Sequence, residues 1–345
     1  MVVKRYLIIT IDTEEEFDWH HVPFLPIGGS VENIGKLCRL QKIFARLNAK
    51  VTYFVDFPVL KNEVSRNILR RFLEQYSAEM GTHLHPWCTP PFEEELNIAN
   101  TMANMLPANL VRSKLETLTE VFVEAFGFRP VSYRAGRFAF DGVSAKIIED
   151  LGYKIDSSIT PFYDWSKSYG PDFFFAPFRP YFINGEDIFL EDKKGGVLEV
   201  PISAGFNRSP FKVWSKIYSF ARKGSLRYLR LVGALDRSNF LKRIILGPEL
   251  QSLGEMKNLV ENLLRENIQV FNMIFHSSSL IPGGNSIIKT IEEAGAFEKR
   301  VIDIVSWIIE ECGAEPIRLS DYFSIKKAGE PVGDVEAGYN PCGSK

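Results

Sequence analysis

The sequence predicts an α/β fold in which a parallel sheet closes into a (β/α) barrel. β-Branched apolar runs alternate with amphipathic helical patterns along most of the 345 residues. Such alternation is typical of a parallel sheet whose faces are covered by helices. About seven strand–helix units fit in the chain, a number for which a barrel is the most economical closure. A doubly wound open sheet is the alternative.

The predicted elements follow one another in a regular order. Residues 2–11 form a continuous β-branched run, and residues 33–47 repeat apolar side chains at helical spacing. Ser65 is a suitable N-terminal cap for the second helix. By the same criteria we expect strands at 2–11, 49–55, 79–85, 131–135, 154–159, 196–202 and 269–276, and helices at 33–47, 65–76, 110–126, 142–151, 254–266 and 290–311.

Two segments interrupt this rhythm. Residues 161–195 are rich in aromatic residues, proline and glycine, and are predicted to be an insertion of loops and short strands. Residues 208–248 form a second insertion that is strongly basic. Residues 326–345 lack any apolar periodicity, which predicts a disordered tail after a single barrel domain at 1–325.

Composition excludes several classes of protein. The 41 Lys and Arg nearly balance the 43 Asp and Glu, so the surface as a whole is not built for nucleic acid. The four cysteines are widely scattered, which argues against a disulfide framework or a thiolate zinc site. No apolar run approaches the roughly 20 residues of a membrane span, and the N-terminus is a poor signal peptide. We therefore expect a cytoplasmic protein.

Polar and titratable residues recur at the carboxyl ends of the predicted strands. In a parallel α/β fold these ends gather on one rim, where active sites are built. Alternate residues of a strand point to the same side, so two pairs at i and i+2 are expected to converge. Two imidazoles and one or two carboxylates would suit zinc or a similar divalent metal. The residues are Asp12 and Glu14, His83 and His85, Arg134, Asp156, and His276.

Each of these residues also has a structural interpretation. Asp12 and Glu14 begin an acidic run that could be a solvated turn, and Arg134 could form a salt bridge at the rim. Asp156 could cap a turn, and His276 could be a buried, hydrogen-bonded residue. The convergence of five separate strands on one rim favours the functional interpretation.

Five short segments resemble the motifs of the polysaccharide deacetylase family, also called the NodB-homology or carbohydrate esterase 4 group. They occur in family order between residue 10 and residue 277, and together they cover most of the predicted barrel. Two departures are visible: the second carboxylate is Glu14 rather than a residue adjacent to Asp12, and the two histidines are two residues apart instead of four. The segments are TIDTE (10–14), GTHLHPW (81–87), YRAGR (133–137), DSS (156–158) and FHS (275–277).

The resemblance implies a distorted (β/α)7-type barrel and a metal-dependent hydrolase that removes an acetyl group from an N- or O-acetylated sugar. The sugar could be a lipid-linked or nucleotide-linked precursor of a surface polysaccharide. In the mechanism that it suggests, Glu14, His83 and His85 hold a divalent metal, most simply zinc. Asp12 is the general base, Arg134 orients it, His276 is the general acid, and Asp156 raises the pKa of His276.

Two other functions remain open at this stage. A glycoside hydrolase could use Asp12 and Glu14 as its acid and base, but carboxylates on one strand are too close for the usual separations of about 5–5.5 or 6.5–9.5 Å, and the histidines would have no role. A metal-free, non-catalytic carbohydrate-binding barrel is the second alternative, and the unusual histidine spacing is its best support.

The basic insertion suggests a further partner. Between residues 208 and 243 there are ten Lys and Arg and one Asp, a charge of +9; since the whole chain carries −2, the remainder carries −11. An amphipathic helix on the inner face of an anionic membrane would have this pattern, as would an ordinary solvated basic face. Its expected apolar face consists of Phe211, Trp214, Ile217, Tyr218 and Ala221.

Overall fold

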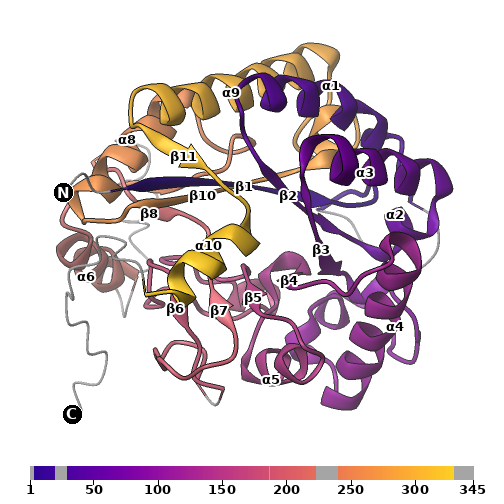
Figure 1. Cartoon of the computed structure of the whole chain (residues 1–345). Helices are drawn as coiled ribbons and strands as arrows, with labels where there is room; N and C mark the ends of the chain where they lie inside the picture. Colours follow the sequence, from indigo (N-terminus) through magenta and orange to yellow (C-terminus); the bar gives the residue numbers. More distant parts are fainter. Residues whose placement is uncertain (1–3, 20–28, 186, 223–239, 330–345) are drawn as a thin grey trace.

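The computed structural model describes residues 4–19, 29–185, 187–222 and 240–329. A curled, mainly parallel sheet lies at its centre, with most helices packed around the outside (Figure 1). This arrangement confirms the predicted barrel-type α/β fold. The sheet order is β10 (Val270–His276), β1 (Arg5–Thr13), β2 (Val51–Val55), β3 (Glu79–Leu84), β4 (Ser132–Ala135), β5 (Ile155–Asp156), β7 (Leu198–Glu199) and β6 (Tyr181–Phe182), with β11 (Ala314–Pro316) also paired to β1.

The barrel closes through irregular backbone rather than through a regular ladder. A separate hairpin of β8 (Ala204–Phe206) and β9 (Arg243–Ile245) fills the space between β7 and β10. Its flanking residues bond to β10: the N–H of Ser203 donates to the carbonyl of Asn272 at 3.0 Å, and the N–H of Ile274 donates to that of Leu246 at 3.1 Å. The barrel is therefore distorted at this seam.

Local sequence signals explain where the helices begin. Ser252 and Glu255 form a capping box at the start of α8, and Thr290 and Glu293 form another at the start of α9. The second predicted helix begins earlier than expected, because Asn62 rather than Ser65 caps it. The helices are α1 (Asn33–Arg46), α2 (Phe57–Lys61), α3 (Glu63–Tyr76), α4 (Ala108–Phe126), α5 (Gly142–Asp150), α6 (Phe211–Arg222), α8 (Leu253–Arg265), α9 (Ile291–Glu310) and α10 (Leu319–Lys327).

Several short elements were not predicted. They include α2, the β8–β9 hairpin, β11 and α10, which are too short for a clear periodic pattern. Within the first predicted insertion, β6 joins the main sheet by pairing antiparallel with β7. Helix α10 extends to Lys327, so the first residues of the predicted tail are helical, whereas residues 330–345 lie outside the described part of the chain.

The buried side chains form two main layers. The larger cluster lies between the sheet and the surrounding helices. A smaller one fills the barrel interior, where Leu319 and Tyr322 of α10 pack with Tyr6 and Phe54. Within the described residues, no helix has the length and the apolar character that crossing a membrane requires.

Candidate active site

The carboxyl ends of the parallel strands bring the predicted residues to one rim. Asp12 on β1 is the register partner of His276 on β10, and His83 on β3 is the partner of Arg134 on β4. Glu14 and His85 follow directly after β1 and β3. Because parallel strands present these ends to the same side, residues more than 250 positions apart in sequence become neighbours.

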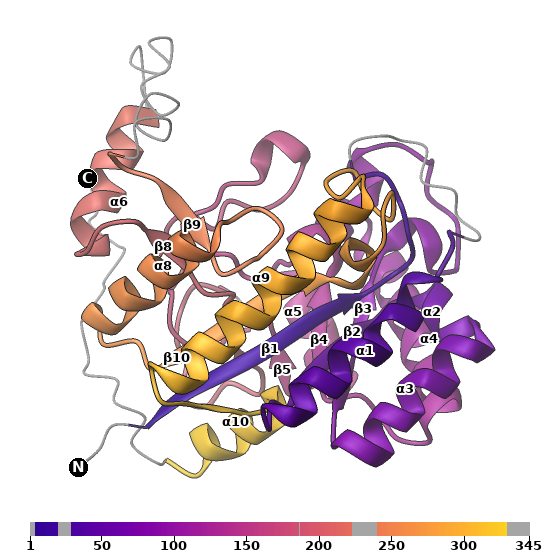
Figure 2. The ribbon, with the colours of Figure 1, turned by 90° about the horizontal axis from the view of Figure 1, so that it is seen from above.

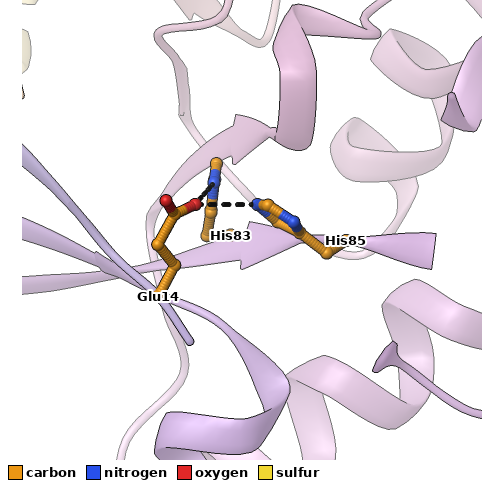
Figure 3. Close-up of side chains that lie close together, drawn as sticks. All are labelled: Glu14, His83 and His85. Atoms are coloured by element: carbon orange, nitrogen blue, oxygen red, sulfur yellow. Dashed lines mark ion pairs between the residues drawn. The ribbon is translucent and has the colours of Figure 1, made fainter. Parts of the chain in front are cut away.

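Glu14, His83 and His85 point toward one another (Figure 3). Oε2 of Glu14 lies 3.2 Å from Nε2 of His85 and 3.6 Å from Nε2 of His83. One ligand atom from each residue lies within 4.8 Å of the others, and all three side chains are buried. The hydroxyl of Ser278 donates to the other carboxylate oxygen of Glu14 at 3.4 Å, which helps to orient Oε2 toward the histidines.

The donor set fits a divalent metal. The carbonyl of Arg134 can only accept, so Nδ1 of His83, 3.1 Å away, carries the hydrogen and Nε2 keeps a free lone pair. Neither ring nitrogen of His85 has a hydrogen-bond partner in the described structure, although both are buried. Burial lowers the pKa of His83, and it lowers that of His85 to about 3, so both rings are neutral, as metal ligands must be. Two histidines and one glutamate with an open position are typical of catalytic zinc.

Asp12 is held by a fully buried arginine. Nη1 of Arg134 donates to Oδ1 of Asp12 at 2.6 Å, while Nη2 donates to Oγ1 of Thr10 and Oγ of Ser157 at 2.8 and 2.9 Å. Burial alone would raise the pKa of Asp12, but the charge and hydrogen bond of Arg134, together with smaller contributions from His83 and His276, outweigh burial and lower this pKa below the ordinary value. Asp12 is therefore ionised, and its Oδ2 lies 3.8 Å from Nε2 of His83.

His276 lies beside the carboxylate oxygen of Asp12 that Arg134 does not bind. Its Nε2 is 3.6 Å from Oδ2 of Asp12, and its ring packs on Trp19 with the centroids 4.4 Å apart. Its Nδ1 lies 3.2 Å from Oε1 of Glu249. Burial opposes the charged ring, but the negative charges of Glu14, Glu249 and Asp12 outweigh burial and raise the pKa of His276 to about 9.

The prediction that Asp156 is the carboxylate beside His276 was wrong. Glu249, not Asp156, occupies the position beside Nδ1 of His276. Asp156 instead accepts hydrogen bonds from the hydroxyl and the N–H of Ser158 at 2.7 and 3.0 Å and is hydrogen-bonded to Glu199. Sequence reasoning missed Glu249 because it follows the short strand β9 inside what was interpreted as an insertion. Gly247 and Pro248 separate Glu249 from the short apolar run at 244–246, so no polar residue at the end of a predicted strand pointed to it.

Comparison with known proteins supports the same architecture. No family model matches the sequence, and no curated protein matches it. Among solved structures, a protein from Mycobacterium smegmatis assigned as a polysaccharide deacetylase superposes with a TM-score of 0.54 at 14% identity, covering 94% of this chain and 90% of that one. A protein from Parabacteroides distasonis assigned as a glycoside hydrolase or deacetylase gives 0.59 at 10% identity, covering 94% and 72%. The PuuE allantoinase gives 0.52 at 12%, covering 94% and 91%.

The chain has the polysaccharide deacetylase fold. In this deacetylase fold, two histidines only two residues apart both reach Glu14, since alternate residues at the end of a strand point to the same side. The unusual spacing in the second motif therefore does not separate the two imidazoles.

A pocket of about 340 Å³ opens above these residues in the deacetylase fold. Its volume lies within the range of small-molecule sites. Trp165 stacks between Phe138 and Tyr163, with ring centroids 5.4 and 5.7 Å apart, and forms one wall. Side chains from the carboxyl ends of the strands form the floor, and further apolar groups complete the lining, among them Met102, Ile245, Leu250, Ile274 and Ile287.

Arg137 lines the same pocket in an unusual backbone conformation. Its φ is 53° and that of Phe138 is 59°, so two consecutive non-glycine residues are left-handed. Such a conformation costs of order 1–3 kcal/mol per residue and tends to occur at functional sites. The turn after β4 therefore places a guanidinium and an aromatic ring at the pocket at the expense of local strain.

Proposed function

We propose that this protein is a metal-dependent hydrolase that removes an acetyl group from an acetylated carbohydrate. The observation that carries the proposal is the convergence of Glu14, His83 and His85 next to the Asp12–Arg134 pair, on the floor of an aromatic pocket. The deacetylase fold supports it, because the site lies at the carboxyl ends of the strands, where barrel enzymes place their catalytic residues.

Glu14, His83 and His85 would hold the metal. The chemistry that a divalent cation would supply there is polarisation of a carbonyl oxygen and a bound water whose pKa is lowered to about 7. Both donor imidazoles are neutral and Glu14 is turned toward them, so the site requires little rearrangement on loading.

Asp12 would act as the general base. Arg134 binds Oδ1 of Asp12. The other oxygen, Oδ2, is left facing His276, which lines the pocket. The same interaction keeps the carboxylate ionised and fixes its orientation, so that Oδ2 can receive a proton from the attacking water.

His276 would act as the general acid. Because its pKa is raised to about 9 in the metal-free protein, Nε2 carries a proton at neutral pH and can deliver it to the departing nitrogen or oxygen. Glu249 fixes the ring from behind through Nδ1. Aromatic side chains in the pocket lining provide flat apolar surfaces on which a sugar ring can stack.

Acetate release from a panel of N- and O-acetylated sugars, with and without chelator, tests the proposal. We expect activity that is lost on chelation and restored by zinc or another divalent cation. His83→Ala should lose both metal and activity. His276→Ala should lose about 10²–10⁴ in rate while its metal content, measured by mass spectrometry, stays unchanged.

The outcomes separate the alternatives. Loss of metal from His276→Ala would make His276 a ligand rather than the acid. Protein that binds acetylated sugars but contains no metal after loading and releases no acetate would be a non-catalytic carbohydrate-binding barrel. The ratio of N-acetyl to O-acetyl turnover in the panel identifies the bond that is cleaved.

A further inference from the structure

Helix α6 carries an apolar stripe that is exposed in the described part of the chain. Val213, Ile217 and Phe220 are 48%, 42% and 69% exposed. Their spacing of four and three residues places them on one side of the helix. Figure 2 shows α6 at the outer edge of the molecule, beyond the β8–β9 hairpin. Single exposed apolar residues are common, but three in a row on one helix face form a continuous patch.

The stripe differs from the apolar face that periodicity predicts. Phe211, Tyr218 and Ala221 of that predicted face are buried against the protein core, and Trp214 is partly buried there. Only Ile217 of that set is exposed. Helix α6 is therefore anchored on one side by aromatic and apolar packing and presents a second apolar surface on the other.

Lysines lie beside the exposed stripe. Lys212 and Lys216 are both exposed and are one turn apart, adjacent to Val213 and Ile217 on the outer face. The segment from residue 208 to residue 243 carries +9 in sequence, against −11 for the remainder of the chain. An anionic surface would therefore attract this region and repel most of the rest of the molecule.

We propose that α6 docks on an anionic lipid bilayer. Phe220, Val213 and Ile217 would enter the boundary between headgroups and acyl chains, and Lys212 and Lys216 would contact the lipid phosphates. Apolar side chains flanked by lysines on one helix face match the chemistry of such a boundary, whereas a protein partner of balanced charge would not use the excess of cations. The proposal does not depend on the acetylated substrate or on the metal.

The docking helix is connected to the pocket wall. The guanidinium of Arg243 lies over the ring of Tyr218 of α6 at 4.8 Å and over the ring of Tyr163 at 4.7 Å. Tyr163 lines the pocket. Docking through α6 would thus bring the membrane surface to the side of the protein that carries this pocket wall.

Vesicle co-sedimentation of the full-length protein tests the proposal. We expect binding to vesicles of equimolar phosphatidylcholine and phosphatidylglycerol, weakening at high salt, and much weaker binding to phosphatidylcholine alone. The double variant K212E/K216E should bind the anionic vesicles about 30-fold less tightly or worse, since each lysine near the surface contributes about 1 kcal/mol. The triple variant V213S/I217S/F220S should lose about tenfold or more.

Matched controls exclude general effects of charge and hydrophobicity. V64S/V143S/I291S removes three exposed apolar side chains from α3, α5 and α9, and K36E/K42E reverses two exposed lysines of α1. Both controls should bind like the wild type, and circular dichroism should show that every variant is folded. Equal binding to neutral and anionic vesicles, or equal losses in the controls, would overturn the proposal. So would light scattering that shows a dimer which only V213S/I217S/F220S dissociates, because the stripe would then be a contact between two copies.

Discussion

Glu249 holds His276 at two points. Its Oε1 accepts a hydrogen bond from the backbone N–H of His276 at 2.7 Å and lies 3.2 Å from Nδ1 of the same residue. The hydroxyl of Ser279 donates to the same oxygen at 3.2 Å. A single carboxylate, from the loop after β9, thus fixes both the backbone at the end of β10 and the imidazole that faces Asp12.

Removing the charge of Glu249 should lower the pKa of His276. In Glu249→Gln we expect this pKa to fall from about 9 toward the ordinary value near 6.5, because one of the negative charges that favour the imidazolium is gone. NMR titration of the His276 ring in metal-free protein measures it. Glu261→Gln, an exposed change on α8, should leave the pKa unaltered. An unchanged pKa in Glu249→Gln would show that Glu14 and Asp12 determine the titration.

The raised pKa of His276 also predicts a pH-dependent contribution to stability. A histidine whose pKa is higher in the folded than in the unfolded protein stabilises the fold fully below about pH 6.5 and loses this contribution as the pH rises through about 9. In urea denaturation, the free energies of unfolding of the metal-free wild type and of His276→Gln should therefore differ most near neutral pH and below. This difference in free energy should become smaller at higher pH. A gap that widens with pH would contradict the assignment.

Arg134 should be important for stability as well as orientation. The guanidinium is fully buried and Asp12 is 2% exposed, so Arg134→Met would leave the buried Oδ1 of Asp12 without its cationic partner. We expect the free energy of unfolding to fall by about 3–5 kcal/mol in urea denaturation. The double variant Asp12→Asn with Arg134→Met removes the stranded charge and should recover part of that loss. A double variant no more stable than Arg134→Met would indicate that packing of the arginine against Phe54, rather than the ion pair, dominates.

Glu199 should keep its proton to a higher pH than an exposed glutamate does. Burial and the adjacent Asp156, its register partner on β5, raise its pKa well above the ordinary value, and the two carboxyl groups are hydrogen-bonded. Glu199→Gln preserves a neutral donor and should be about as stable as the wild type near pH 5. The variant should become relatively more stable as the pH rises, since the wild type must keep a proton on Glu199.

Glu199→Ala is the matched comparison. It removes the donor to Asp156 and should be less stable than Glu199→Gln by about 1–3 kcal/mol across the pH range, because Asp156 is fully buried. Urea denaturation of both variants across the pH range separates the two effects. Equal stability of Glu199→Gln and Glu199→Ala would show that the shared hydrogen bond contributes little.

The sequence alone determined the barrel-type fold and most of the rim. Strand and helix periods are local properties, and a parallel sheet necessarily places the ends of its strands together. That is why Asp12, Glu14, His83, Arg134 and His276 could be identified without coordinates. The histidine spacing was also interpretable, because alternate residues on a strand share a side.

Only the tertiary structure decided which carboxylate serves His276 and which side of α6 is exposed. Asp156 directly follows Ile155 at a predicted strand, whereas Glu249 comes after Gly247 and Pro248, and the irregular closure of the barrel between β7 and β10 determines which of them reaches the imidazole. Likewise, the apolar residues of α6 surround much of the helix, so periodicity could not show that Tyr218 packs inward while Phe220 faces outward. Both outcomes depend on packing between segments distant in sequence, which a local pattern does not encode.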